Sequence, residues 1–234
     1  IDLDVEQTRA LCTNVIDALV DLHQVDYKKH PDLVNLGRGE GYCERQVTGW
    51  DKRYVKAKTP NVPSFGLVRQ WLSKHTPADS KTCLIHNDWR FDNVILDAAD
   101  PTKVIGVLDW EMATLGDPLM DLGSALAYWV EEDDNIIMQQ SRRQPTHLKG
   151  MMTRDEVVDY YLKQSGLKID NWTFYEVFGL FRLAGIVQQI YYRYYNKQTT
   201  NPAFKNFWLI VHVLHAKCLK LIAQYEGEAL FNTY

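Results

Sequence analysis

The sequence predicts an α+β fold that is mostly helical and contains a few short strands. Apolar residues recur at intervals of three and four over long segments at both ends of the chain, as the buried face of a helix requires. Between residues 84 and 108 the pattern changes to short apolar runs separated by polar loops, which favours strands. No repeat, low-complexity tract or linker divides the chain, so we expect residues 1–234 to form a single domain.

Helices are expected on both sides of these strands. They should cover, in chain order, about residues 4–22, 42–56, 64–74, 153–165, 173–196 and 202–227. Three of them begin with a pair of residues spaced as a capping box, in which two side chains reciprocally bind backbone N–H groups. The pairs are Asp4 with Gln7, Thr153 with Glu156, and Thr173 with Glu176. The prolines of segment 59–63 separate the second and third helices, and Pro202 suits the first turn of the last one.

Two stretches, LIHNDWRFDN at 84–93 and VIGVLDWE at 104–111, carry the candidate chemistry. In the first, a short loop leaves an apolar strand, presents Asp88 and enters a second strand; in the second, a strand delivers Asp109 at its end. Phosphoryl transfer needs a carboxylate that faces the attacking hydroxyl and oxygen ligands that hold divalent metal on the phosphates. Asp88 suits the first task, and Asn93 with Asp109 suits the second. The helix that begins after Asp4 should pack under this loop.

The same residues have simpler interpretations. A histidine, an aspartate and an asparagine at this spacing occur by chance in many chains, although the order strand, loop, strand, turn, strand is the one that kinase-like enzymes use. Arg90, two residues after Asp88, could neutralise charge on the transferring group. It could equally form a salt bridge with Asp92 or Glu111.

Taken together, LIHNDWRFDN, VIGVLDWE and GDPLMDL at 116–122 resemble the aminoglycoside phosphotransferase family, a branch of the protein-kinase-like superfamily. GYCERQVTGW at 41–50 and LHQVD at 22–26 are similar to the subgroup of phosphotransferase domains associated with acyl-CoA dehydrogenases. The resemblance covers the chain up to about Trp129, and beyond it only the helical character matches.

This resemblance implies the carboxy-terminal lobe of a kinase-like fold, in which a few short strands carry the catalytic loop. It implies that Asp88 is the catalytic base and that Asn93 and Asp109 bind Mg²⁺ and, through it, ATP or GTP. It further makes His86 a residue that orders the loop and Asp121 a buried anchor that accepts hydrogen bonds from the loop backbone.

At one position the sequence departs from the family. Asn87 stands where most relatives have glycine, and asparagine is among the few other residues that tolerate a positive φ.

A second departure concerns what precedes the motifs. Complete kinase-like enzymes carry, before them, a mostly β lobe with a glycine-rich flap and a strand lysine. Nothing before Leu84 resembles either, and the glycine cluster at 37–41, which lacks a preceding apolar strand, is expected to form a turn. Since the chain also begins at Ile1 without a methionine, we expect the amino-terminal nucleotide lobe to be missing and this fragment alone to be inactive.

Composition narrows the function classes. A net charge of -4 and a pI near 6.0 give no basic face for nucleic acid. No apolar run approaches the roughly twenty residues that cross a bilayer, and the acidic amino terminus does not resemble a signal peptide. The four cysteines are far apart and form no C-x-x-C pair, so reduced thiols in a cytoplasmic protein are expected.

Several other features have both a functional and a structural interpretation. His212 and His215 lie one helical turn apart and could share a metal, but their apolar neighbours favour packing. The tyrosine-rich run 191–195 could stack on a base or sugar, or pack at the rim of the core. The acidic run 131–134 could attract a cationic amino sugar, or form a solvated loop.

The function that these observations favour is a Mg²⁺-dependent phosphotransferase. It would move the terminal phosphoryl group of ATP or GTP to a hydroxyl of a small-molecule acceptor, whose identity the sequence leaves open. One alternative is a pseudokinase, a non-catalytic kinase-like binding module. Another is a metal-dependent hydrolase in which Asp88, Asp109, Asp117 and Asp121 form the metal cluster, although Asp117 and Asp121 also suit structural roles at a helix start.

Overall fold

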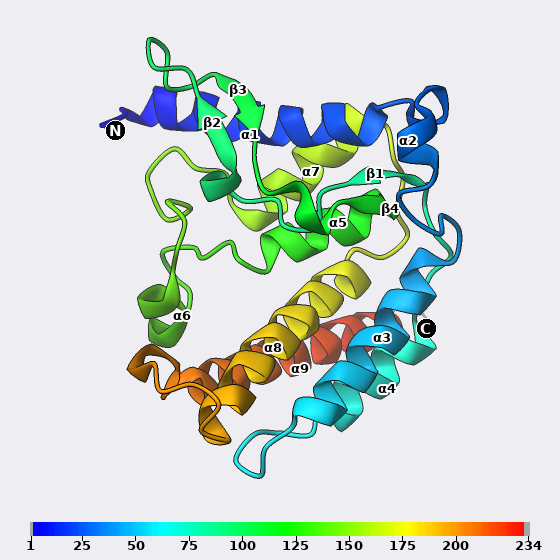
Figure 1. Cartoon of the computed structure of the whole chain (residues 1–234), viewed down its shortest axis with the longest axis vertical. Coiled ribbons are helices and arrows are strands. Elements are labelled where there is room, and N and C mark those ends of the chain that lie inside the picture. The colour runs from blue at the N-terminus through cyan, green and yellow to red at the C-terminus, as the bar shows by residue number, and fades with distance from the viewer. Residues whose placement is uncertain (1, 232–234) are drawn as a thin grey trace.

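The computed structural model describes residues 2–231 and combines helices with two small β-ladders, one of which lies at the edge of the molecule (Figure 1). The α-helices are α1 (Val5–Gln24), α2 (Pro31–Val34), α3 (Tyr42–Ala57), α4 (Gly66–Lys74), α5 (Pro118–Leu126), α6 (Ile136–Ser141), α7 (Arg154–Ser165), α8 (Thr173–Tyr195) and α9 (Phe207–Phe231). The mostly helical α+β fold expected from the apolar periodicity is confirmed.

Four short strands make up the two ladders. They are β1 (Cys83–Ile85), β2 (Val94–Leu96), β3 (Val104–Val107) and β4 (Thr114–Gly116). β1 pairs antiparallel with β4, and β2 pairs antiparallel with β3. The sequence analysis predicted the first three but not β4, because a three-residue strand directly before Asp117 has the same local signature as the turn expected there. It also missed the short helices α2 and α6, and of α5 it predicted only the start.

Two of the three predicted capping boxes are present, and the third is absent although its helix begins at the predicted residue. Asp4 and Thr153 cap α1 and α7, each in a complete capping box. At α8 the predicted box does not exist, since Thr173 is already the first helical residue and Trp172 occupies the capping position. The N–H of Thr173 instead donates to the Asn171 side chain at 2.9 Å, so an asparagine two residues earlier satisfies this helix end.

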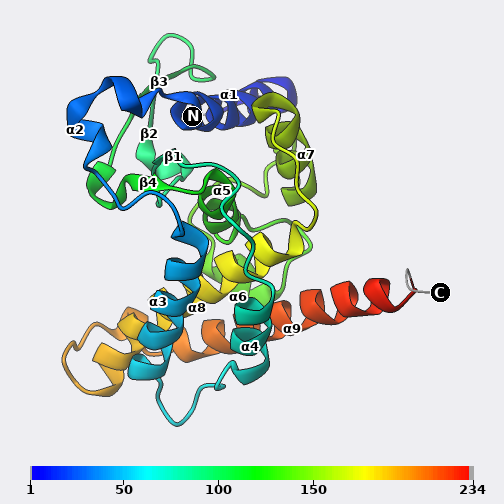
Figure 2. The ribbon, with the colours of Figure 1, turned by 90° about the vertical axis from the view of Figure 1, so that its right-hand side faces the viewer.

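The last helix also begins later than predicted. Pro202 starts a 3₁₀ turn (Pro202–Phe204), and α9 follows from Phe207. Within the described part of the chain, segment 202–228 is the one helical stretch whose length and apolar composition would allow it to cross a membrane. No such segment was expected from the sequence. Here it packs along α8, α4 and α6, and its carboxy-terminal end extends away from the body of the molecule (Figure 2).

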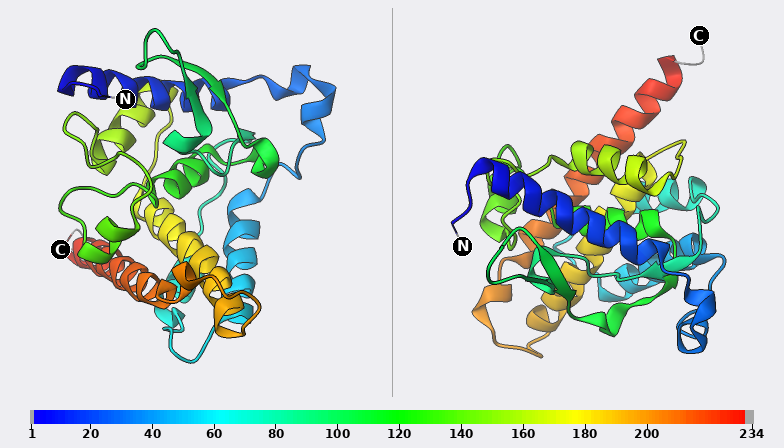
Figure 3. Two further views of the ribbon diagram at one scale, coloured as in Figure 1. Left: turned by 60° about the vertical axis from the view of Figure 1, so that its left-hand side comes forward. Right: turned by 90° about the horizontal axis from the view of Figure 1, so that it is seen from above.

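The elements form two groups that meet at α5 and α8. α1, α7 and the β2–β3 hairpin lie together on one side, in the upper part of the left view in Figure 3. α8 is the central helix of the other group, where it packs against α3, α4 and α9, and it also contacts α5. As expected, α1 lies beside β1, the strand that leads into the 86–93 loop.

Glycines allow α5 and α8 to approach closely. A Cβ atom added to Gly123 would lie 2.5 Å from the carbonyl oxygen of Tyr175, and one added to Gly179 would overlap the carbonyl oxygen of Gly123. Both obstacles are backbone atoms, so the helices would have to separate to accept a side chain. α5 carries Asp121, and its distance from α8 therefore affects the candidate site described below.

We expect Gly179→Ala to lower the free energy of unfolding by about 2 kcal/mol or more, because the methyl group would push apart two helices. Gly227→Ala is the matched control, since Gly227 lies in α9 with no atom within 4 Å of an added Cβ. That change should raise stability by up to about 1 kcal/mol through helix propensity. Urea unfolding followed by circular dichroism measures both, and equal effects of the two substitutions would contradict the close-packing argument.

Candidate functional site

The 86–93 loop, which joins β1 to β2, is anchored by a buried carboxylate. Asp121 on α5 has no exposed surface, and it accepts hydrogen bonds from the backbone N–H groups of His86 and Asn87, both at 2.8 Å. Its Oδ2 also lies 3.0 Å from Nε2 of His23. Burial by itself raises the pKa of the Asp121 carboxyl, but the hydrogen bond and charge of His23 and the two N–H donors outweigh it, so the pKa is lowered.

His23 connects this anchor to two further helices. It is a buried residue near the end of α1, and its Nδ1 lies 2.6 Å from the hydroxyl of Tyr161 on α7. Burial raises the pKa of the Tyr161 hydroxyl above its ordinary value. The sequence analysis did not single out either residue, although the LHQVD stretch contains His23.

His86 links the loop to the strand that precedes Asp109. Its ring is fully buried, Nε2 donates to the carbonyl oxygen of Leu108 at 2.9 Å, and Nδ1 accepts from the N–H of Asp88 at 3.3 Å. These partners require the neutral ring protonated on Nε2, since Nδ1 acts as an acceptor. The N–H of Leu108 in turn donates to the carbonyl oxygen of Asn93 at 2.7 Å.

Asn87 adopts the left-handed conformation considered for it, with φ 66°. All four of its polar groups are hydrogen-bonded: the N–H to Asp121, the carbonyl oxygen to Arg182, Oδ1 to the Tyr42 hydroxyl, and Nδ2 to the carbonyl oxygen of Met112. Glycine at this position would keep the backbone bonds and lose the two side-chain bonds. Asparagine therefore adds a link between α3, the loop and the segment after Asp109.

Asp88 and Asn93 lie side by side. Nδ2 of Asn93 donates to the carbonyl oxygen of Asp88 at 2.7 Å and lies 3.2 Å from its Oδ2. Oδ1 of Asn93 has no hydrogen-bond partner within residues 2–228, for which side chains are described. Asn93 is buried and Asp88 is half-buried, so the loop places an amide and a carboxylate side by side.

Asp109 follows directly on Leu108, whose backbone is tied to both His86 and Asn93. It has a positive φ of 63° and an exposed side chain that makes no hydrogen bond or ion pair to the described residues. Aspartate is one of the residue types that tolerate this conformation, which at a non-glycine residue is often found at functional sites. The oxygens of Asp109 and Asn93 are thus available to a cation of the oxygen-preferring kind, such as Mg²⁺.

Arg90 forms the predicted ion pair with Asp92 and, in addition, lies close to Asp88, a contact that the sequence analysis did not predict. Its Nε lies 3.3 Å from Oδ1 of Asp88, and its Nη2 lies 3.6 Å from Oδ2 of Asp92. The guanidinium stands 5.4 Å from the centre of the Tyr128 ring. Arg90 therefore faces the carboxylate of Asp88 while it also pairs with Asp92, and no ion pair with Glu111 is found between described residues.

Of the four carboxylates in the hydrolase alternative, two have structural partners. Asp117 caps α5, since Oδ1 accepts from the N–H groups of Leu119 and Met120, and Oδ2 accepts from Ser80. Asp121 anchors the loop.

Asp117 also belongs to a cluster of possible metal ligands with Cys43 and Asp79, whose ligand atoms lie within 4.8 Å. Asp79 accepts from the N–H groups of Tyr42 and Cys43, so the oxygens of both carboxylates already bind N–H donors. This cluster is explained by helix capping.

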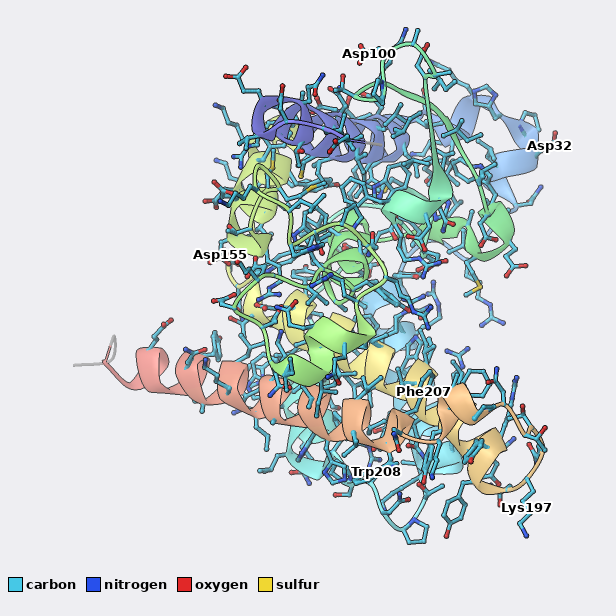
Figure 4. All side chains as sticks on the ribbon, turned by 90° about the vertical axis from the view of Figure 1, so that its left-hand side faces the viewer. Asp32, Asp100, Asp155, Lys197, Phe207 and Trp208 are labelled. Atoms are coloured by element: carbon cyan, nitrogen blue, oxygen red, sulfur yellow. The ribbon has the colours of Figure 1, made fainter. Side chains whose placement is uncertain are left out.

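A cavity of about 780 Å³ opens beside Arg90. Its lining includes the apolar residues Leu183, Ile186 and Ile190 of α8. Phe207, which Figure 4 shows at the start of α9, also lines it. Two further arginines, Arg142 and Arg143, line it, and no Asp or Glu is among its described lining residues. The cavity is therefore apolar with a positively charged margin.

The remaining sequence features are structural. In the acidic run, Asp134 is only 7% exposed and pairs with Arg154 and Lys217, both at 2.6 Å, so it belongs neither to a solvated loop nor to a surface that could attract a cation. The Asp134 carboxyl is partly desolvated, but these two cations lower its pKa overall.

Among the histidines and tyrosines noted in the sequence, the contacts found are structural, while His212 and Tyr195 are exposed. Nε2 of His212 lies 2.9 Å from the carbonyl oxygen of Asn61, and the His215 ring packs 4.6 Å from that of Phe65. Tyr191 is buried with its hydroxyl bonded to the Asn61 side chain.

Comparison with known proteins connects this geometry to a family. The sequence model of the phosphotransferase enzyme family matches residues 2–173. Mouse acyl-CoA dehydrogenase family member 10 is 36% identical over 193 residues, which cover 82% of this chain and 18% of the mouse protein. Chicken acyl-CoA dehydrogenase family member 11 is 32% identical over 213 residues, 88% of this chain and 27% of the relative. The chain thus spans only about a fifth to a quarter of the length of these relatives.

Solved structures agree. A Ralstonia eutropha protein classed as an aminoglycoside phosphotransferase superposes with a TM-score of 0.79 at 26% identity, over 93% of this chain and 67% of that one. The choline kinase LicA from Streptococcus pneumoniae has a TM-score of 0.55 at 13% identity, over 96% of this chain and 67% of that one, and supports the fold alone. The resemblance seen in the motifs is confirmed: this chain belongs to the phosphotransferase enzyme family and has a kinase-like fold.

Proposed function

We propose that this chain is the catalytic and acceptor-binding lobe of a Mg²⁺-dependent phosphotransferase, which moves the terminal phosphoryl group of ATP or GTP to a hydroxyl of a small molecule. One observation carries the proposal. The backbone of Leu108 is bonded to both His86 and Asn93, which brings Asp109 beside the loop that presents Asp88. A base and two oxygen ligands supplied from two adjoining segments are what phosphoryl transfer requires.

In the mechanism that we infer, Asp88 orients the acceptor hydroxyl and accepts its proton as the oxygen attacks the phosphorus. The amide of Asn93 holds the Asp88 carboxylate in place through Nδ2 and leaves Oδ1 free for the metal. Arg90, 3.3 Å from Asp88, supplies a fixed positive charge near the transferring group. Asn93 and Asp109 would hold Mg²⁺, which when bound neutralises and aligns the nucleotide phosphates.

The cavity beside Arg90 is the proposed acceptor site, and its lining favours one class of acceptor. A polycationic amino sugar would bring its charges against Arg90, Arg142 and Arg143. An apolar molecule that carries a hydroxyl and an anionic group would instead bury its body against α8 and pair its anion with an arginine. We therefore propose acceptors of this second class.

Two alternatives lose support from specific contacts. Asp117 and Asp121 are occupied by N–H donors, which disfavours a four-carboxylate hydrolase centre. A non-catalytic, pseudokinase-like module would have no need for free ligand oxygens on Asn93 and Asp109 beside a tethered Asp88. We further propose that the chain is a single domain, the carboxy-terminal lobe of a kinase-like phosphotransferase. It would act together with an amino-terminal nucleotide lobe in the cytoplasm and bind neither nucleic acid nor membrane.

Asp88→Asn and Asp109→Asn, made in the full-length protein, test the catalytic assignment. The first should lower kcat by about 10²- to 10⁴-fold by removing the base, and the second should lower it comparably by removing a metal ligand. Asp133→Asn, at an exposed residue outside the site, is the control and should leave kcat unchanged. ADP release in a coupled assay with and without EDTA gives the rates. Retention of the unmodified rate by either site variant, with an unchanged unfolding midpoint, would defeat the assignment.

Acceptor chemistry can be tested with three probes: a medium-chain hydroxy fatty acid, the matching diol without a carboxylate, and an aminoglycoside. The hydroxy acid should give the highest kcat/KM. The double variant Arg142→Gln, Arg143→Gln should raise its KM by about tenfold, because a charge-assisted hydrogen bond is lost, and should leave the KM of the diol unchanged. Arg193→Gln, outside the cavity lining, serves as control. Preference for the aminoglycoside would refute this choice of acceptor.

A further inference from the structure

We propose that Arg182 is a positioning residue of the phosphoryl-transfer site, which fixes the peptide between Asn87 and Asp88 and so the direction in which the Asp88 carboxylate points. This inference rests on the proposed function. Arg182 lies in the middle of α8, remote in sequence from the motifs, and nothing in the motif pattern draws attention to it. Its Nη2 donates to the carbonyl oxygen of Asn87 at 2.9 Å.

The guanidinium of Arg182 is buried beside an aromatic ring and a backbone carbonyl group. Arg182 is only 6% exposed, yet no carboxylate of the described residues lies within ion-pair distance of its guanidinium. Its neighbours are the Trp50 ring, whose centre is 5.5 Å away, and the Asn87 carbonyl. A buried cation without a carboxylate partner costs free energy, and an apolar side chain would fit such a helix better. Among the described residues, the one polar contact of this buried guanidinium is with the loop, which points to a role for Arg182 in holding the loop.

The peptide unit between Asn87 and Asp88 is hydrogen-bonded at both of its polar groups. The carbonyl of Asn87 and the N–H of Asp88 belong to the same planar unit. Arg182 holds the carbonyl oxygen, and His86 Nδ1 accepts from the N–H at 3.3 Å. With both ends held, rotation of this plane is restrained. Because Nδ2 of Asn93 also binds the carbonyl oxygen of Asp88, the backbone is held on both sides of Asp88, and this sets its Cα–Cβ direction. Without Arg182 only the longer of these two hydrogen bonds would restrain it, next to a residue in the left-handed conformation.

The helix that carries Arg182, α8, also lines the proposed acceptor cavity. The following residues of α8, among them Leu183, Ile186 and Ile190, form the apolar wall of the proposed acceptor cavity. One helix thus contacts the acceptor on one face and holds the loop with the base from another. Arg182 would keep the Asp88 carboxylate in register with the acceptor hydroxyl, and displacements of about 1 Å in such an alignment can cost about 10²-fold in rate.

The test compares Arg182→Met, which keeps the length and removes the charge and donors, with Arg182→Lys, which keeps the charge and one donor group. In the full-length protein we expect the Met variant to lose about 100-fold in kcat. The KM values for nucleotide and acceptor should stay within about threefold, since no substrate contact is lost. The Lys variant should recover at least about tenfold of that loss. Arg193→Met, exposed on the same helix, is the matched control and should behave as the unmodified protein.

A kcat within about threefold of the unmodified value in the Met variant would overturn the proposal, as would a loss carried by KM. A loss of kcat that follows a lowered unfolding midpoint and is not rescued by lysine would assign Arg182 a merely structural role. Should the Met variant fail to fold, the Lys variant decides alone: its kcat must fall while both KM values hold.

Hydrogen exchange separates this inference from the proposed function. If the unmodified protein shows no acceptor-dependent turnover, the proposed function fails, and the amides of Asn87 and Asp88 still report on Arg182. Their exchange should be at least about tenfold faster in the Met variant, with exchange in α1 and the β2–β3 hairpin unchanged. Exchange at the unmodified rate for both amides would overturn the positioning role.

Discussion

The site depends on one buried carboxylate. Asp121 has no exposed surface and would be costly to bury as an isolated charge, but two backbone N–H groups and His23 surround it. The same contacts join α5, α1 and the 86–93 loop, so the partners that stabilise the charge are also the elements that must be held together. Removing any one of them would leave a buried charge with too few partners, and the loop would lose its shape along with the helix packing. Loop geometry and core stability are therefore coupled here.

A chain of hydrogen bonds, most of them to backbone groups, connects Asp121 to the candidate site residues. Asp121 holds His86 and Asn87, His86 holds Leu108, and Leu108 holds Asn93. In the contacts of Asp121 with the loop and of Leu108 with Asn93, the donors are main-chain N–H groups, whose positions vary less than those of side chains. In the contact between His86 and Leu108 the donor is the fully buried ring of His86. A phosphoryl-transfer site needs such rigidity, since its catalysis is mostly alignment and fixed charge. α8 likewise has two roles: it supplies the apolar wall of the proposed acceptor cavity, and it contacts the loop through Arg182.

Comparison of expectation with structure shows which signals are reliable. The boxes at Asp4 and Thr153 were predicted because each depends on atoms three residues apart. The box at Thr173 failed because Asn171, two residues upstream, provides the competing acceptor. β4 was missed because a three-residue strand has almost no pattern of its own and exists through its partner β1. In the acidic run, the sequence offered a substrate-binding or a solvated loop, whereas Asp134 forms a buried ion cluster with Arg154 and Lys217, which are distant in sequence.

The sequence by itself determined the family, the helical character and the residue types at the loop, because these follow from short-range spacing: a base, an amide and a carboxylate at fixed intervals between apolar strands. Only the tertiary structure decided that Tyr42 and Arg182 bind that loop, that His23 binds its anchor Asp121, and that three arginines and no described acid border the cavity. The physical reason is the distance in sequence between the residues that interact. Caps, turns and strand alternation are set by neighbours within a few residues, whereas the surroundings of a buried charge are set by whichever helices pack over it, and that arrangement is not encoded at any single position.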